Sequence, residues 1–195
     1  MSAPIYITRH GQTDWNVEQR VQGQVDTDIN AIGRRQAKAN GRKLALMVPD
    51  SSAFTFIASP MRRTRETMEI IRAEMGLPRD GYKVDPRLVE IHFGDWQGST
   101  FRELEEAKPG TTAGRDADKW RFRPPGDTAE SYELLAERIR PWFEALTGPA
   151  IVVTHGGVIR SLFHLANGLS GAEAAMMDVP QDRVLELGNG RVRWL

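Results

Sequence analysis

Two similar stretches, IYITRHG at residues 5–11 and IVVTHGG at residues 151–157, decide how this sequence is interpreted. Each is a short run of apolar and β-branched residues that ends in a histidine followed by glycine, which is typical of a buried strand and a tight loop. In an open α/β sheet, ligands bind beyond the carboxyl ends of the strands. The sequence therefore predicts that His10 and His155 lie at a ligand-binding edge.

Strand-like and helix-like segments alternate along the chain. This alternation predicts an α/β fold, a three-layer sandwich in which a mostly parallel sheet is flanked by helices. Beyond the two opening runs, the patterns predict a strand over residues 54–58, helices over residues 30–48, 59–75, 131–146 and 158–166, and a terminal hairpin of residues 184–187 and 191–195 around Gly188-Asn189-Gly190. No repeat or linker interrupts them, so we expect one domain over residues 1–195.

Local signals place the ends of these helices. Asn30 is an N-cap candidate, and Ser59 with Pro60 resembles an N-cap followed by a proline in the first turn. In the helix predicted over residues 131–146, Pro141 is expected to cause a kink or break. The apolar face expected for that helix consists of Leu134, Leu135, Ile139, Trp142 and Phe143.

Residues 106–130 carry proline, glycine and mixed charges without a sustained period, and we expect an irregular, lid-like excursion there. Two interpretations remain open: a lid that closes over part of a bound substrate, and a solvated basic loop. The side chains that would serve a lid are Arg115, Lys119, Trp120, Arg121 and Arg123.

Composition excludes several classes of protein. The chain has 195 residues, 26 Lys and Arg against 26 Asp and Glu, and no cysteine. The absence of cysteine rules out disulfide scaffolds, Cys₄ zinc sites and thiolate nucleophiles. A net charge of zero argues against a broad nucleic-acid-binding face. The longest apolar run, residues 44–48, is far shorter than a membrane span, and no secretory signal is evident. We expect a cytoplasmic protein that binds neither membrane nor nucleic acid.

Arginines accompany the histidines. Arg9 adjoins His10, and Arg62 falls in the first turn of the helix predicted over residues 59–75. Helix N-termini attract anions, so an arginine there indicates a phosphate site. The alternative for Arg62 is a solvated side chain beside Arg63 and Arg65.

The motifs around these residues resemble the histidine phosphatase superfamily, the phosphoglycerate-mutase-like proteins. Residues 9–16, RHGQTDWN, are similar to its RHG-x-T-x-x-N signature. The similarity continues in family order through residues 20–23, 26–37, 59–67, 90–98 and 153–157. The resemblance thus covers most of the chain.

The resemblance implies that His10 is a nucleophile that accepts the phosphoryl group, and that Arg9, Arg62 and His155 bind its oxygens. It also implies that Glu90 protonates the leaving group, with Asp14 and Asp95 as weaker candidates. Further contacts to substrate are implied for Thr13, Asn16, Gln22, the Gly23 backbone and the Gly156 N–H group.

Metal-free chemistry without a cofactor is expected. His92 and His164 lack the spacing of metal ligands, and we interpret both as structural or exposed. Asp26-Thr27-Asp28 is similar to an aspartate phosphatase motif, but no apolar strand precedes it, so a turn is expected.

Within the superfamily, the sequence favours a phosphatase. Mutases usually carry an Arg-His-Tyr-Gly run after the glutamate, whereas this chain has EIHFG at residues 90–94. His155 is followed by glycine, not by the aspartate of the acid phosphatase branch. The block that usually reads Gly-Glu-Ser departs from the pattern, because three residues separate Gly126 from Glu130 and Ser131.

Several alternatives remain open. The chain is either a phosphatase, a cofactor-dependent phosphoglycerate mutase or a non-catalytic phosphate-binding module. The expected partner is a small phosphorylated metabolite: a sugar phosphate, α-ribazole phosphate, phosphoserine or phosphoglycerate. The sequence does not indicate an oligomeric state.

Overall fold

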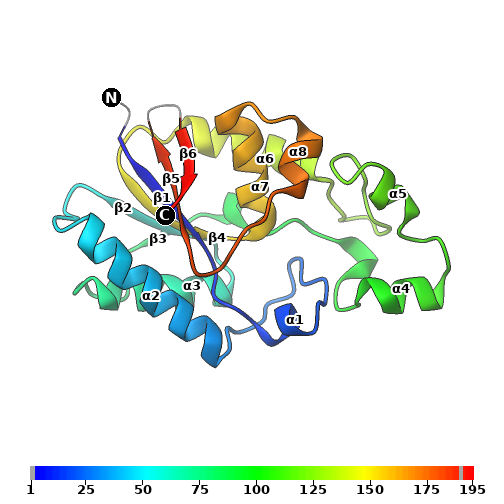
Figure 1. Ribbon diagram of the computed structural model, residues 1–195, viewed down its shortest axis with the longest axis horizontal. Coiled ribbons are helices and arrows are strands. Elements are labelled where there is room, and N and C mark those ends of the chain that lie inside the picture. Colours follow the sequence, from blue (N-terminus) through cyan, green and yellow to red (C-terminus); the bar gives the residue numbers. More distant parts are fainter. Residues whose placement is uncertain (1–2, 189–190) are drawn as a thin grey trace.

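The computed structural model describes residues 3–188 and 191–195. Within these residues, one sheet has the strand order β3-β2-β4-β1-β5-β6 (Figure 1). The strands are β1 Ile5–Arg9, β2 Thr55–Ala58, β3 Lys83–Val84, β4 Ala150–Thr154, β5 Val184–Gly188 and β6 Arg191–Trp194. The helices are α1 Asp14–Val17, α2 Ala31–Met47, α3 Arg62–Glu74, α4 Phe101–Ala107, α5 Ala113–Ala117, α6 Tyr132–Glu144, α7 Gly156–Asn167 and α8 Gly171–Met176. Short 3₁₀ turns occur at Pro86–Leu88 and Gly94–Trp96.

The sheet is parallel from β3 to β1 and antiparallel where β5 and β6 are added. The register of β1 and β4 pairs Arg9 with Thr154 at their carboxyl ends. The next residues in both strands are histidines, and the His10 N–H donates to the Thr154 carbonyl at 2.9 Å. Adjacent parallel strands thus bring His10 and His155 to one point, as the sequence predicted.

Helices cover both faces of the sheet (Figure 1). Ile7 and Val152 point to one face, into a core shared with α6 and α7. Their neighbours Tyr6 and Ile151 point to the other face, into a core shared with α2 and α3. Because alternate residues of a strand face opposite sides, β1 and β4 carry consecutive apolar residues, at positions 5–7 and 150–153. The predicted three-layer α/β sandwich is confirmed.

The predicted start of α3 is wrong. Asn30 caps α2 as expected, accepting from the Gly33 N–H group, but Ser59 does not cap α3. The Ser59 hydroxyl instead lies 2.8 Å from His155 Nε2, and the helix begins at Arg62 after an N-cap at Met61. A tertiary contact thus takes the side chain that a local pattern had assigned to the helix.

Other boundaries need smaller corrections. The helix α6 continues through Pro141 without a break, and Leu134, expected on its apolar face, is 42% exposed. The helix α7 starts at Gly156, two residues earlier than predicted, so the glycines after His155 form its first turn. The terminal hairpin is confirmed as β5 and β6, but residues 189 and 190 of its predicted turn lie outside the described residues.

The excursion is more regular than predicted, because it contains α5 and follows directly from α4. Figure 1 shows both helices at the end of the molecule opposite α2, beyond the sheet. Trp120 anchors the segment by stacking on Tyr132 and packing against His164. In the described part of the chain, no helix combines the length and apolar character needed to cross a membrane.

Candidate active site

The rings of His10 and His155 face each other at the carboxyl end of the sheet, with centroids 5.3 Å apart. Both are buried, with 2% and 0% of their surfaces exposed. His10 Nδ1 lies 2.8 Å from the Gly11 carbonyl, a contact that requires a proton on Nδ1. The Nε2 atom of His10 therefore carries the lone pair available to attack an electrophile.

Both histidines are held neutral. Burial, together with the charges of Arg63 and Arg9, lowers the pKa of His10 well below its usual value. The pKa of His155 is lowered by burial and by Arg63, with a further contribution from His10. A neutral imidazole is the form that can act as a nucleophile, so burial and these neighbours favour that form of His10 at neutral pH.

Two arginines surround the histidines. Arg9 donates through Nη1 to the Val179 carbonyl at 3.1 Å. Arg63 is fully buried and donates to the Val25 and Gly23 carbonyls at 2.8 and 2.7 Å. Burial lowers the pKa of Arg63 to about 10, which leaves it charged at neutral pH. Two cations are thus fixed by backbone carbonyls instead of carboxylates, which leaves their charge available to an anion.

Three nitrogens of this cluster lack a partner within the described structure: Arg9 Nε, Arg63 Nε and His155 Nδ1, all buried. Buried donors without an acceptor are rare and costly, and they point to an absent ligand. A phosphoryl group, with three oxygens that accept hydrogen bonds, matches this set of donors.

The structure does not bring Arg62 to the site. Its side chain is 64% exposed and pairs with Asp28 at 2.9 Å. Arg62 is the first residue of α3, and the next residue is rotated by about 100° around the helix axis, so Arg63 points inward instead. The sequence predicted that Arg62 lies at the site. In the structure the next residue, Arg63, has that position.

Glu90 lies beside the histidines, where its carboxylate accepts from the Gly157 N–H group at 3.0 and 3.1 Å. A second backbone group, the N–H of Ile91, donates to its Oε1 at 2.9 Å. A Cβ at position 157 would collide with that carboxylate, so only glycine permits this approach. The second glycine of IVVTHGG, Gly157, is therefore required for the Glu90 carboxylate to approach the start of α7.

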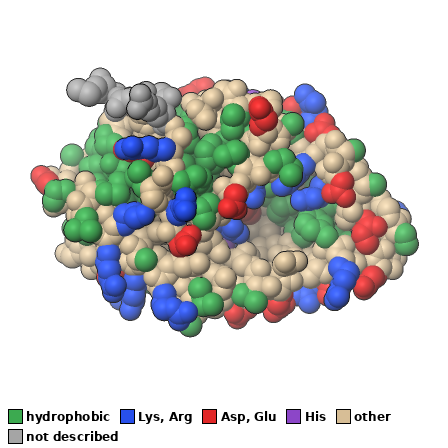
Figure 2. Space-filling view, viewed as in Figure 1, with side chains coloured by type: hydrophobic (Ala, Val, Ile, Leu, Met, Phe, Trp, Pro, Cys, Tyr) green, Lys and Arg blue, Asp and Glu red, His purple; other side chains and the backbone are tan. Residues whose placement is uncertain are grey.

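A cleft of about 250 Å³ opens onto these residues. Figure 2 shows a hollow on this face, to the right of centre, with apolar and basic side chains around it. Its inner lining includes Arg9, His10, Arg63, Glu90 and Gly156, and its outer lining includes Tyr132, Arg160, Arg115 and Lys119. The described cleft is therefore strongly cationic, although the chain as a whole is neutral.

A family model described as "Histidine phosphatase superfamily (branch 1)" matches residues 5–194. The chain belongs to this superfamily. It is 34% identical over 205 residues to a glucosyl-3-phosphoglycerate phosphatase of Mycolicibacterium vanbaalenii, a match that covers 98% of this chain and 82% of the relative. A metal-independent phosphoserine phosphatase of Arabidopsis thaliana is 31% identical, over 82% of this chain and 66% of the relative.

Solved structures agree with this family. A mycobacterial glucosyl-3-phosphoglycerate phosphatase in complex with VO3 superposes with a TM-score of 0.80 at 29% identity, covering 100% of this chain and 96% of the other. The predicted family, fold and enzyme class, a phosphatase, are confirmed.

In this histidine phosphatase, most of the residues predicted to bind substrate line the cleft: Asn16, Gln22, Gly23 and Gly156. Thr13 does not. It is buried and caps α1, accepting from the Asn16 N–H at 3.1 Å. Thr13 thus fixes the first turn of α1, which carries Asn16, and Asn16 Oδ1 also accepts from Gln181 Nε2. Its motif position signals turn geometry, not contact with substrate.

The remaining acidic and histidine candidates lie elsewhere. Asp14 accepts from Asn30, and neither Asp14 nor Asp95 lines the cleft. His92 accepts from the Gly94 N–H, and His164 donates to the Leu169 carbonyl, so both are structural as predicted. Within residues 3–188 and 191–195, no group of three or more His, Asp or Glu side chains is placed to hold a metal ion.

The sequence interpretation missed several cleft residues of this phosphatase. One is Arg160, which donates to the Met177 carbonyl and lies 3.5 Å from the Tyr132 hydroxyl. Gln181, which is not part of the cleft lining, was also missed: its Nε2 donates to the His10 carbonyl. The position of Arg160, one turn of α7 beyond Gly156, was the signal that would have found it. Of the five side chains proposed for a lid, Arg115 and Lys119 line the cleft, whereas Trp120, Arg121 and Arg123 do not.

Proposed function

We propose that this chain hydrolyses a small phosphomonoester through a phosphohistidine formed on His10. The supporting observation is the neutral, buried histidine pair beside two arginines whose buried Nε atoms have no hydrogen-bond partner among the described residues. Such a site offers an uncharged nucleophile and fixed donors for a transferring phosphoryl group. The relatives named as phosphatases agree with this chemistry.

The reaction takes two steps. His10 Nε2 attacks phosphorus, the ester P–O bond breaks with its electron pair on oxygen, and Glu90 gives that oxygen a proton. Water then attacks the phosphohistidine, the P–N bond breaks, and Glu90 receives the proton of the water. The products are an alcohol and inorganic phosphate, and the enzyme is regenerated.

Arg9, Arg63 and His155 bind the non-bridging oxygens in this proposal. Arg63 replaces Arg62 in the role expected from the sequence. The Gly156 N–H group adds a donor, because the first N–H groups of α7 have no partner within the helix. These donors are fixed before substrate arrives, which is what makes them effective against transition-state charge.

The outer cleft favours a substrate that carries a second anionic group. Arg160 lies beside the Tyr132 hydroxyl, and Lys119 lies over the Tyr132 ring, 5.8 Å from its centre. Burial and the charges of Arg160 and Arg115 lower the pKa of Lys119 to about 8. An anion there would relieve the repulsion among these cations. Phosphoglycerate and phosphoserine esters, named in the relatives, both carry a carboxylate.

The proposal includes the organisation of the chain. Residues 1–195 form one histidine phosphatase domain, and residues 106–130 serve as a lid that presents Arg115 and Lys119 to the non-phosphate part of the substrate. A cytoplasmic location, with a soluble phosphorylated metabolite as partner, completes the proposal and is tested by cell fractionation.

The deciding experiment is a rate panel over phosphorylated metabolites, with and without a carboxylate, in which phosphate release and phosphoglycerate isomerisation are measured together. We expect phosphate release, fastest on carboxylate-bearing esters, and an acid-labile, base-stable label on His10 in rapidly quenched enzyme. Isomerisation faster than hydrolysis would make the chain a mutase. Absence of turnover and of label would leave only a phosphate-binding module.

A further inference from the structure

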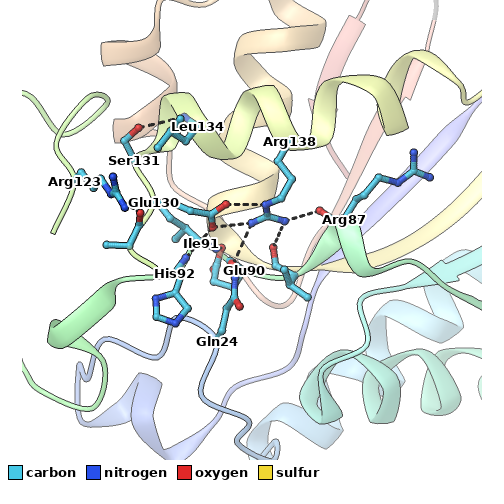
Figure 3. Close-up of polar contacts among 12 residues, drawn as sticks. Gln24, Arg87, Glu90, Ile91, His92, Arg123, Glu130, Ser131, Leu134 and Arg138 are labelled. Atoms are coloured by element: carbon cyan, nitrogen blue, oxygen red, sulfur yellow. Dashed lines mark hydrogen bonds and ion pairs between the residues drawn. The ribbon is translucent and has the colours of Figure 1, made fainter. Parts of the chain in front are cut away.

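Arg138 of α6 contacts three backbone carbonyls of the segment that carries Glu90 (Figure 3). Its Nη1 donates to the Arg87 carbonyl at 2.6 Å and to the Val89 carbonyl at 3.1 Å. Its Nη2 is 3.3 Å from the carbonyl of Glu90 itself. One guanidinium therefore holds the backbone on both sides of the expected acid.

Glu130 fixes the guanidinium and extends the contact. Its two carboxylate oxygens accept from Arg138 Nε at 2.8 Å and from Arg138 Nη2 at 2.9 Å. Its Oε2 also accepts from the His92 N–H at 3.0 Å, and its own N–H donates to the His92 carbonyl at 2.8 Å. Arg138 and Glu130 together therefore form hydrogen bonds with the backbone on both sides of Glu90.

This segment needs side-chain support because it has no regular structure of its own. Residues 89–93 lie between the turns Pro86–Leu88 and Gly94–Trp96, outside every helix and strand. Backbone groups there must find partners from elsewhere. Arg138 and Glu130 provide them, and Gln24 Nε2 adds a further donor to the Glu90 carbonyl at 2.9 Å.

The grip is stiff. The two side chains are only 23% and 19% exposed, and their contact is a two-pronged ion pair, the strongest geometry available to an arginine and a carboxylate. The Glu90 carboxylate must meet the Gly157 N–H and the leaving group at once. Displacements of about 1 Å are enough to cost about 100-fold in rate when a reacting group is misplaced.

We propose that Arg138 and Glu130 are positioning residues that hold Glu90 where it can protonate the leaving group. The inference rests on the proposed role of Glu90. It also gives the Glu130-Ser131 motif two functions: Ser131 caps α6, accepting from the Leu134 N–H, and Glu130 orients the arginine two turns along that helix.

The test compares substrates whose leaving groups differ in acidity. A nitrophenolate departs without a proton, whereas an alkoxide needs one. We expect R138M to lose about 10- to 100-fold in kcat on alkyl phosphates, the range typical of removing a group that orients a reacting one. On nitrophenyl phosphate we expect a loss below about 3-fold, with unchanged labelling of His10.

E130Q keeps the size of the side chain but weakens the ion pair, and we expect the same pattern, smaller in extent. R138K keeps the positive charge but lacks the guanidinium that makes the two-pronged ion pair. Its rate on alkyl phosphates should lie between those of R138M and the unmodified enzyme. R140M, at an exposed position of the same helix, is the matched control and should behave as the unmodified enzyme. In the double variant R138M/E90Q, the alkyl phosphate rate should fall no further than in E90Q alone.

The outcomes separate this inference from the function on which it rests. If E90Q loses equally on both substrate classes, the acid role of Glu90 is wrong. If E90Q discriminates between them but soluble R138M and E130Q do not, Glu90 is the acid and the positioning role is overturned. If R138M does not fold, the rates of E130Q and R138K on alkyl phosphates and on nitrophenyl phosphate provide the same test.

Discussion

The two ends of the cleft are built differently. At the inner end, His10 and His155 follow adjacent strands of one sheet, and Arg63 is fully buried in α3. At the outer end, Arg115 and Lys119 lie on or beside α5, a helix of five residues outside the sheet. In the proposed function, the sheet fixes the groups that act on phosphorus, whereas the excursion supplies the groups that face the rest of the substrate. We therefore expect reaction type and substrate choice to depend on separate parts of the fold.

The largest effect should follow from removing the nucleophile at the inner end. We expect H10A to lose at least about 10³-fold in kcat on every phosphomonoester, including those with good leaving groups. Phosphate release and quenched-enzyme labelling measure this. The control is H164A, whose ring lies outside the cleft lining. Substantial turnover by H10A would show that the inner end does not act by phosphohistidine chemistry.

The next effect tests which arginine belongs to the inner end. R63M should lower kcat/KM by about 100-fold or more, because it removes a fixed donor to the transferring group. R62M, which changes an exposed side chain paired with Asp28, should stay within about 3-fold. R63K, which retains a charge, shows whether any loss comes from folding alone. Equal effects of R62M and R63M would contradict the structural assignment.

Changes at the outer end should alter substrate preference and leave chemistry intact. K119M and R115M should each raise KM for carboxylate-bearing phosphate esters by about 10-fold, the value of one charge-assisted contact. Their kcat on nitrophenyl phosphate should be unchanged. R121M, an exposed arginine of the same segment, is the control. A fall in kcat on all substrates would mean that the excursion supports the inner site after all.

The same lysine predicts a pH dependence confined to the outer end. Because the pKa of Lys119 is lowered to about 8, its charge is lost as the pH rises through that value. KM for carboxylate-bearing esters should therefore rise above pH about 8 in the unmodified enzyme, and K119M should remove this rise. The measurement is KM for these esters from pH 6 to 9 in the unmodified enzyme and in K119M. A rise that persists in K119M would assign the titration to another group.

The smallest effect concerns stability at the inner end. The pKa values of His10 and His155 are lowered in the folded protein, so below their ordinary value the unfolded chain binds more protons than the folded one. Stability should therefore fall as the pH drops through about 6.5. Denaturant unfolding at pH 7 and pH 5 measures the change, which should shrink in H155A. Stability that is flat over this range in both proteins would contradict the burial of neutral histidines.

The predictable parts of the fold were those encoded by neighbours in sequence. The runs at residues 5–11 and 151–157 show buried strands because both faces of a central strand are apolar. Asn30 caps its helix because its Oδ1 is free to accept from the Gly33 N–H group, while its Nδ2 donates to Gln12 and Asp14. Ser59 has the same local signal for an N-cap but does not cap its helix, because its hydroxyl lies 2.8 Å from His155 Nε2 in the folded chain.

The same limit applies to the site. Motifs that resemble the family's were sufficient to find Arg9, His10 and Glu90, which line one cleft, and His155, whose ring lies beside that of His10. They misplaced the third cation by one position, because only the true start of α3 decides whether residue 62 or 63 points inward. Arg138 gave no local signal for contact with the Glu90 segment, since the three carbonyls to which it donates lie 48 to 51 residues earlier in the chain.

The sequence by itself determined the layered α/β fold, the two strand-end histidines and the absence of a cysteine nucleophile. These features depend on residue type and short-range periodicity, which are properties of the chain before it folds. Only the tertiary structure decided which arginine is buried, which lid cations reach the cleft and what holds Glu90 in place. Those choices depend on contacts between distant segments, whose energies exist only after the sheet and helices have packed together.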